Sequence, residues 1–152
     1  MSTSRKNARQ STPQIEKLAP HDYEVLAEFR YVLMRFLAFS EHAAASAGLA
    51  PRQHQALLAI KGYPGARGVT IGDLAERLGI RHHSAVGLVD RLVSRGYLAR
   101  RQDPRDRRRM LLSLTAAGEQ ALAGLSLTHR QELRRVAPLL NGLLSRLEPP
   151  GD

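Results

Sequence analysis

A short arginine-rich segment holds the residues best suited to bind a charged partner. The sequence RRQDPRDRRR, Arg100–Arg109, contains six arginines and two aspartates, so its formal charge is +4. Guanidinium groups pair with phosphate oxygens and enter narrow, A·T-rich minor grooves. Asp103 and Asp106 could instead hold the metal of a phosphodiesterase, but the sequence around them offers no third acidic ligand and no rigid support. The segment therefore favours polyanion binding, and we expect neither catalysis nor a metal or cofactor.

The composition of the whole chain points in the same direction. Its 152 residues carry a formal net charge of +9 and include no cysteine and no tryptophan. Nucleic acid and acidic membranes are the partners of such a basic chain. The absence of cysteine excludes disulfides, thiol redox chemistry and sulfur-ligated zinc. Without a long apolar run or a secretory signal we expect a cytoplasmic protein with no membrane partner. The few aromatic residues favour double-stranded DNA over stacked single strands.

The arginine-rich segment lies at the tip of a predicted hairpin. Residues 97–101 and Met110–Leu114 have the residue types of short strands and flank the charged turn. Along such a returning strand Arg107 and Arg109 would share one face, and Arg108 would point to the other. A hairpin of this kind directly after two short helices is typical of a wing.

Two predicted helices precede this wing. Thr70 and Asp73 form a capping box for the first helix, and Gly79 ends it. The second helix covers about His82 to Arg95 and has apolar residues on one face: Ala85, Leu88, Val89 and Leu92. Two short helices joined by a tight turn form a helix-turn-helix, whose second helix can enter a major groove of duplex DNA.

Longer helices are predicted on both sides of this unit. The first begins at Asp22, its predicted N-cap, ends at Gly48, and has more apolar surface than a monomer needs. Pro51 suits the first turn of the short helix that follows. Thr115 caps a long C-terminal helical region, which we expect Pro138 to kink or divide.

These elements predict a mostly α-helical fold with a small β-wing. Residues 20–152 would form one domain, with a winged helix-turn-helix at about 50–115 and flanking helices at about 20–48 and 116–147. Residues 1–19 are polar and basic, so we expect them to form a flexible arm.

The central part of the chain resembles the MarR family of bacterial regulators. The resemblance covers residues 70–118 and rests on VDRLVSRGYLARR, on DPRDRRR in the wing and on LTAAG at the start of the next helix. It implies a homodimer with interlocking terminal helices, which would be the dimerisation helices, and two winged units that read a pseudo-palindromic operator. It also implies repression, with release of the DNA when a small anionic aromatic or lipophilic effector enters a cleft beside the dimerisation helices.

The candidate DNA contacts lie at the start of the second short helix and in the wing. Short or hydrogen-bonding residues let that helix approach base edges, so His83 is expected to read a base and Ser84 to contact a phosphate or a base edge. Arg105 is the expected minor-groove contact. Alternatively, His82 and His83 are merely solvated residues of the first turn. They are not expected to form a metal site, because two adjacent imidazoles on a helix do not converge on one ion. The full set is Arg81, His82, His83, Ser84, Gly87, Arg91, Arg105, Arg107, Arg108 and Arg109.

The sequence also suggests an ion pair within the wing and a set of effector contacts. The resemblance favours an ion pair of Asp103 with Arg107 that braces the wing, although Arg101 and Arg109 are equally placed in the sequence. A carboxylate effector could contact His42, near the end of the first long helix, together with Arg52 and His54, at the start of the short helix that begins at Pro51. The remaining alternative for the whole chain is a winged-helix module that binds protein, or nucleic acid without sequence preference.

Overall fold

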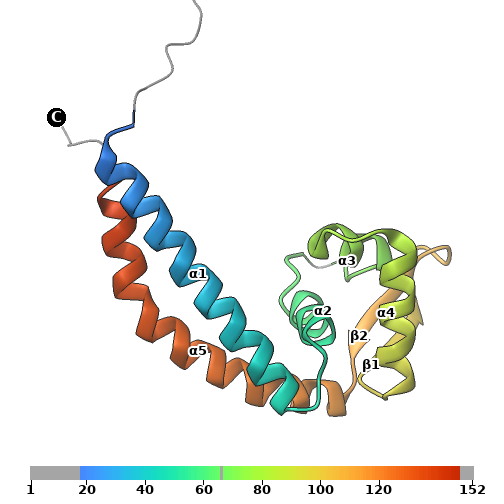
Figure 1. Ribbon diagram of the computed structural model, residues 1–152. Coiled ribbons are helices and arrows are strands. Elements are labelled where there is room, and N and C mark those ends of the chain that lie inside the picture. Colours follow the sequence, from blue (N-terminus) through green and yellow to red (C-terminus); the bar gives the residue numbers. More distant parts are fainter. Residues whose placement is uncertain (1–17, 66, 148–152) are drawn as a thin grey trace, which may run out of the picture.

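The computed structural model describes residues 18–65 and 67–147. Its elements are α1 (Pro20–Ser46), α2 (Pro51–Lys61), α3 (Ile71–Leu78), α4 (His82–Ser94), β1 (Leu98–Gln102), β2 (Met110–Leu114) and α5 (Ala116–Ser145). The predicted fold class, mostly helical with a small wing, is confirmed (Figure 1). The predicted flexible arm lies outside the described residues except for its last two, Leu18 and Ala19.

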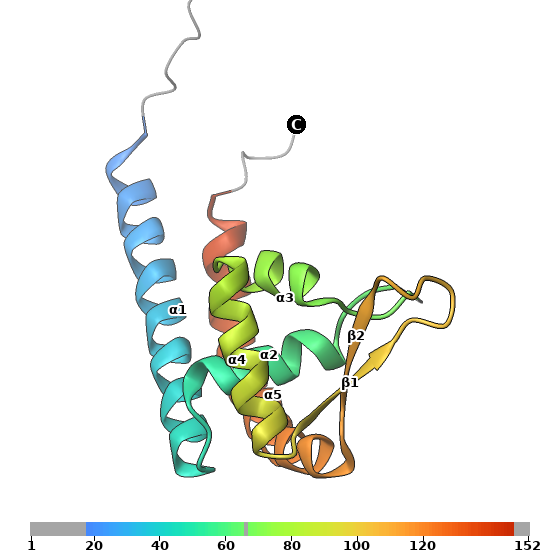
Figure 2. The same ribbon diagram turned by 90° about the vertical axis from the view of Figure 1, so that its right-hand side faces the viewer.

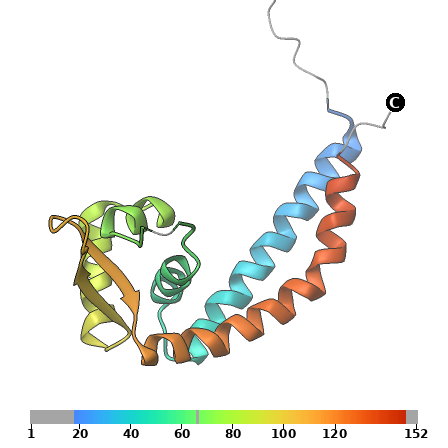
Figure 3. The same cartoon turned by 180° about the vertical axis from the view of Figure 1, so that it is seen from behind.

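The molecule has two parts that meet at the end of α1 and the start of α5. The helices α1 and α5 run antiparallel and side by side, while α2, α3, α4 and the hairpin form a compact unit beside them (Figures 1 and 3). The compact unit contains the main core, in which Leu57, Leu74 and Leu92 are fully buried. A second, smaller cluster joins α1 to α5 through Val25, Val32, Val136 and Leu143.

The boundaries of α1 differ at one end from the expected ones. The helix begins at Pro20 with Ala19 as N-cap, so the prediction that Asp22 is the N-cap is wrong. Asp22 instead lies inside the first turn, where its carboxylate accepts a hydrogen bond from the Ala19 backbone N–H at 2.7 Å. A carboxylate in this position satisfies an open N–H and also suits the positive end of the helix dipole. At the other end Gly48, with φ 75°, terminates the helix as predicted.

The helix-turn-helix is confirmed in detail. Thr70 Oγ1 accepts a hydrogen bond from the Asp73 backbone N–H at 3.2 Å, and the Asp73 carboxylate accepts one from the Thr70 backbone N–H at 2.8 Å. This pair is the predicted capping box. Gly79 ends α3 in the left-handed conformation, with φ 61°. The apolar face predicted for α4 is the buried one, formed by Ala85, Leu88, Val89 and Leu92.

The wing is a two-stranded antiparallel sheet that leads directly into α5. Leu98 pairs with Leu114 and Gln102 with Met110, so β1 begins one residue later than expected. Thr115 caps α5 as predicted, because its side chain accepts a hydrogen bond from the Gly118 backbone N–H. Pro138 does not divide α5, which is continuous through it.

Candidate nucleic-acid interface

The first turn of α4 is the most open part of the helix-turn-helix. Arg81, the N-cap of α4, and the three residues after it, His82, His83 and Ser84, are all exposed. No side chain caps this helix end. Its first backbone N–H groups therefore remain available to an acceptor such as a phosphate oxygen. The helix itself lies on the side of the compact unit away from α1 and α5 (Figures 1 and 3).

The following turns of α4 carry a glycine and an arginine on the same face. Gly87 is half-buried and Arg91 is exposed. A Cβ built at Gly87 would lie 3.5 Å from Nη1 of Arg91, so this guanidinium extends back over the glycine. Position 87 itself adds no side chain to this face, which the Arg91 guanidinium partly covers.

Two arginines outside the predicted set fix α4 in place. Arg100 on β1 donates to the Asp90 carboxylate at 2.5 Å, which joins the middle of α4 to the wing. Arg95, the C-cap of α4, donates to Gln53 Oε1 at 2.9 Å and to the Gly48 carbonyl at 3.0 Å. The helix α4 is thus tied to the wing, to the start of α2 and to the turn between α1 and α2. Sequence reasoning missed both arginines: the partners of Arg95 lie more than forty positions away, and Asp90, ten positions from Arg100, belongs to a different element.

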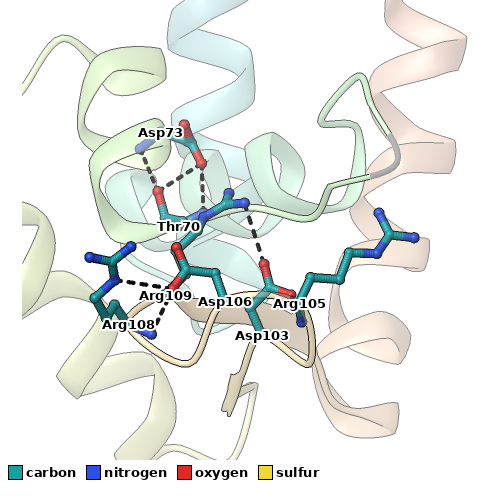
Figure 4. A network of polar contacts seen from close by, with 7 residues as sticks. All are labelled: Thr70, Asp73, Asp103, Arg105, Asp106, Arg108 and Arg109. Atoms are coloured by element: carbon teal, nitrogen blue, oxygen red, sulfur yellow. Dashed lines mark hydrogen bonds and ion pairs between the residues drawn. The ribbon is translucent and has the colours of Figure 1, made fainter.

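The wing is braced by Asp103, whose side chain is buried. Its Oδ1 accepts a hydrogen bond from the Arg105 backbone N–H at 2.9 Å, and its Oδ2 lies 3.3 Å from Nη1 of Arg109 (Figure 4). The ion pair predicted from the family resemblance, Asp103 with Arg107, is therefore wrong, and the alternative with Arg109 is correct. The reason is the path of the turn: the Asp103 backbone N–H donates to the Arg109 carbonyl, which places Arg109 opposite Asp103, whereas the Arg107 carbonyl faces the Gln102 side chain.

The tip of the wing presents arginines to solvent. Arg105 extends away from Asp103 (Figure 4), and both Arg105 and Arg107 are exposed. Asp106 accepts hydrogen bonds from the Arg108 backbone and guanidinium, although the Arg108 side chain is 92% exposed. The predicted alternation along a strand is wrong, because Arg107, Arg108 and Arg109 precede β2. Of the ten predicted contacts only Gly87 and Arg109 are half-buried, and the others are exposed.

The wing is also coupled electrostatically to the start of α3. Hydrogen bonds from Thr70 and, more weakly, the positive charge of Arg109 hold the pKa of Asp73 below its usual value. The capping carboxylate of α3 is therefore ionised at neutral pH, and it lies close to the wing brace (Figure 4).

The three residues predicted to contact an effector do not converge. His54 is buried and stacks on His129 of α5, with ring centroids 4.7 Å apart. Burial, and secondarily the neighbouring His129, lower the pKa of His54. The Arg52 guanidinium donates instead to the Leu78 carbonyl at the end of α3. His42 is exposed on α1.

The described residues also bear on metal binding and on membrane insertion. No group of three or more histidine, aspartate or glutamate side chains in residues 18–65 and 67–147 is arranged to hold a metal ion. None of the described helices is long and apolar enough to cross a membrane.

Comparison with known proteins identifies the family. The model of the MarR family matches residues 47–109. The uncharacterized HTH-type transcriptional regulator YcgE of Bacillus subtilis (strain 168) is 31% identical over 119 residues, which are 78% of this chain and 71% of that relative. The chain belongs to the MarR family. It is accordingly a DNA-binding transcription regulator and not an enzyme.

Solved structures of MarR-type proteins have the same fold. CouR from Rhodococcus jostii RHA1, bound to p-coumaroyl-CoA, is 26% identical, with a TM-score of 0.61 over 81% of this chain and 91% of CouR. A point mutant of S. aureus MepR, bound to an oligodeoxyribonucleotide, is 18% identical, with a TM-score of 0.62 over 87% of this chain and all of that one. The MarR assignment thus rests on both sequence and fold.

Proposed function

We propose that this MarR-family chain is a homodimeric repressor that binds a pseudo-palindromic operator and leaves it when a small effector binds. The observation that carries the proposal is the joint placement of the first turn of α4 and the arginine-rich wing. Both lie on the side of the molecule farthest from α1 and α5 (Figures 1 and 3). A recognition helix in a major groove and a wing in the adjacent minor groove need this placement.

Within this interface the proposed roles follow from side-chain chemistry. His83, exposed in the first turn, is the base reader, and Ser84 with the open N–H groups of α4 binds a phosphate or a base edge. Arg105 enters the minor groove. The remaining members of the set, Arg81, His82, Gly87, Arg91, Arg107, Arg108 and Arg109, approach or border the duplex.

The second copy of the chain is proposed to cover the exposed apolar side chains of α1 and α5. On α1 these are Tyr23, Leu26, Tyr31, Leu33, Met34 and Leu37, and on α5 they include Leu133, Leu139 and Leu144. Monomeric soluble proteins rarely expose so many large apolar side chains together. A two-fold dimer also matches the symmetry of a pseudo-palindromic operator.

The effector is proposed to be a small anionic aromatic or lipophilic molecule. CouR, whose structure contains p-coumaroyl-CoA, supports a ligand of this class. His42, Arg52 and His54 remain the proposed contacts, and Arg52 would have to leave the Leu78 carbonyl to join the other two. Titration of the protein–DNA complex with p-coumaroyl-CoA, with Arg52→Ala as the variant, tests this part of the proposal.

A gel-shift titration tests the function itself. The probe is the DNA upstream of the protein's own gene, with random duplex as competitor at two salt concentrations. Operator binding that survives excess random duplex supports the proposal, and His83→Ala should then change the sequence preference more than the total affinity. Equal displacement by random duplex would instead favour the module that binds nucleic acid without sequence preference.

A further inference from the structure

A basic hollow lies beside the wing, and two of the arginines that line it, Arg67 and Arg101, are outside the set of contacts described above. It has a volume of about 710 Å³ and is formed by the wing together with the loop between α2 and α3. That loop runs out alongside the hairpin (Figure 2). Four arginines from three segments line the hollow: Arg67 from the loop, Arg101 from β1, and Arg105 and Arg109 from the turn of the wing.

The charges in this hollow do not cancel. Arg109 is neutralised by Asp103, and the other acidic lining residue, Asp106, pairs with Arg108. Within residues 18–65 and 67–147 no carboxylate lies within ion-pair distance of the three remaining guanidinium groups, those of Arg67, Arg101 and Arg105. Like charges around one hollow repel each other, and a polyanion placed there would relieve the repulsion.

Arg67 is held at this position by the backbone around it. Val69 forms a bridge with Leu112, whose backbone N–H donates to the Val69 carbonyl at 2.8 Å, so the loop is attached to the wing sheet. Gly68 has φ +77°, and a Cβ there would lie 3.2 Å from the Leu111 side chain. The positive φ favours a glycine, and a larger residue would also require the Leu111 side chain to shift by a few tenths of an ångström. The attachment of Val69 to β2 therefore holds the backbone of Arg67 beside the wing.

We propose that Arg67 and Arg101, which lie beside Arg105, clamp the phosphate backbone of the DNA strand next to the minor groove that Arg105 enters. The inference rests on the proposed DNA-binding function and extends its interface by two residues. Guanidinium groups bind phosphate oxygens through paired N–H donors. Phosphate contacts raise the affinity for every duplex and position the protein without reading sequence.

Two single variants, Arg67→Gln and Arg101→Gln, test the clamp in the full-length chain. Each is compared with the wild type for binding to the operator and to a random duplex by fluorescence anisotropy across a range of salt concentrations. Each variant should bind both duplexes roughly three- to tenfold more weakly per protomer. The slope of log affinity against log salt should also fall by about 1 per protomer. Arg130→Gln, on the exposed surface of α5, is the matched control and should change neither quantity.

The outcomes separate this inference from the function on which it rests. Tight operator binding by the wild type, with unchanged affinity and salt slope in Arg67→Gln and Arg101→Gln, would refute the clamp and leave the regulator intact. A loss confined to the operator would also refute it, because the residues would then read sequence. Failure of the wild type to bind any duplex would overturn both. Thermal unfolding of each variant verifies that the exposed substitutions leave the fold unchanged.

Discussion

Replacement of Asp103 by alanine should loosen the wing although it removes none of the arginines proposed to contact DNA. The carboxylate accepts the Arg105 backbone N–H at 2.9 Å and pairs with Arg109 at 3.3 Å. Because Asp103 is only 5% exposed, water cannot easily replace these contacts. The alanine variant leaves one backbone donor and one guanidinium without their acceptor.

The expected magnitude follows from these two contacts. A hydrogen bond to a charged acceptor contributes about 1.5–3 kcal/mol. The ion pair adds only about 0.5 kcal/mol, because the Arg109 side chain is 34% exposed and solvent screens the pair. Asp103→Ala should therefore lower the free energy of opening of the wing by about 2–3 kcal/mol, which corresponds to a factor of about 30 to 150 in the open population.

Native-state hydrogen exchange measures this change directly. The backbone N–H of residue 103 donates to the Arg109 carbonyl, so its exchange reports opening of the wing. Asp106→Ala is the matched control: its carboxylate pairs with the 92% exposed Arg108, and removing it should cost less than about 1 kcal/mol. Equal exchange rates in the wild type and Asp103→Ala, or an equal effect of Asp106→Ala, would refute the reasoning.

Two more outcomes can be checked by equilibrium unfolding. Gly118→Ala should destabilise the protein by about 1–3 kcal/mol, because the added Cβ would collide with the Tyr97 carbonyl, whereas Gly124→Ala, where a Cβ meets no atom within 4 Å, should stabilise it by about 0.5–1 kcal/mol. A stabilising Gly118→Ala would contradict the close approach of the two segments. Because the pKa of His54 is lowered in the folded state, the unfolded state takes up its proton first, so stability should fall as the pH drops below about 6.5. His54→Phe should reduce this dependence, and identical pH profiles for the two proteins would show that His54 does not cause it.

The elements were predictable from the sequence where their signals are local. Gly48 and Gly79 end helices because they adopt positive φ, and Thr70 with Asp73 caps α3 through contacts three residues apart. These interactions depend only on neighbouring residues, so a single sequence reveals them.

The side-chain partners at the site were not predictable in the same way. Whether Asp103 pairs with Arg107 or with Arg109 depends on the path of the turn between the strands, and the sequence offers both. The stack of His54 on His129 joins α2 to α5 across 75 positions of the chain, and no local pattern links the two rings. Such contacts arise only when the helices pack against each other.

Because the wing joins α5 directly, a movement of α5 is transmitted to the wing. Only Thr115 separates β2 from α5, and it is fixed there, since its backbone N–H donates to the Tyr97 carbonyl and its hydroxyl to the Gly96 carbonyl. At 1.5 Å per residue, the 30 residues of α5 span about 45 Å along the helix. A tilt of about 5° at one end of such a rod displaces the other end by about 4 Å, more than the length of a hydrogen bond. A rotation of a few degrees far from the wing would therefore displace the wing by more than the length of a hydrogen bond.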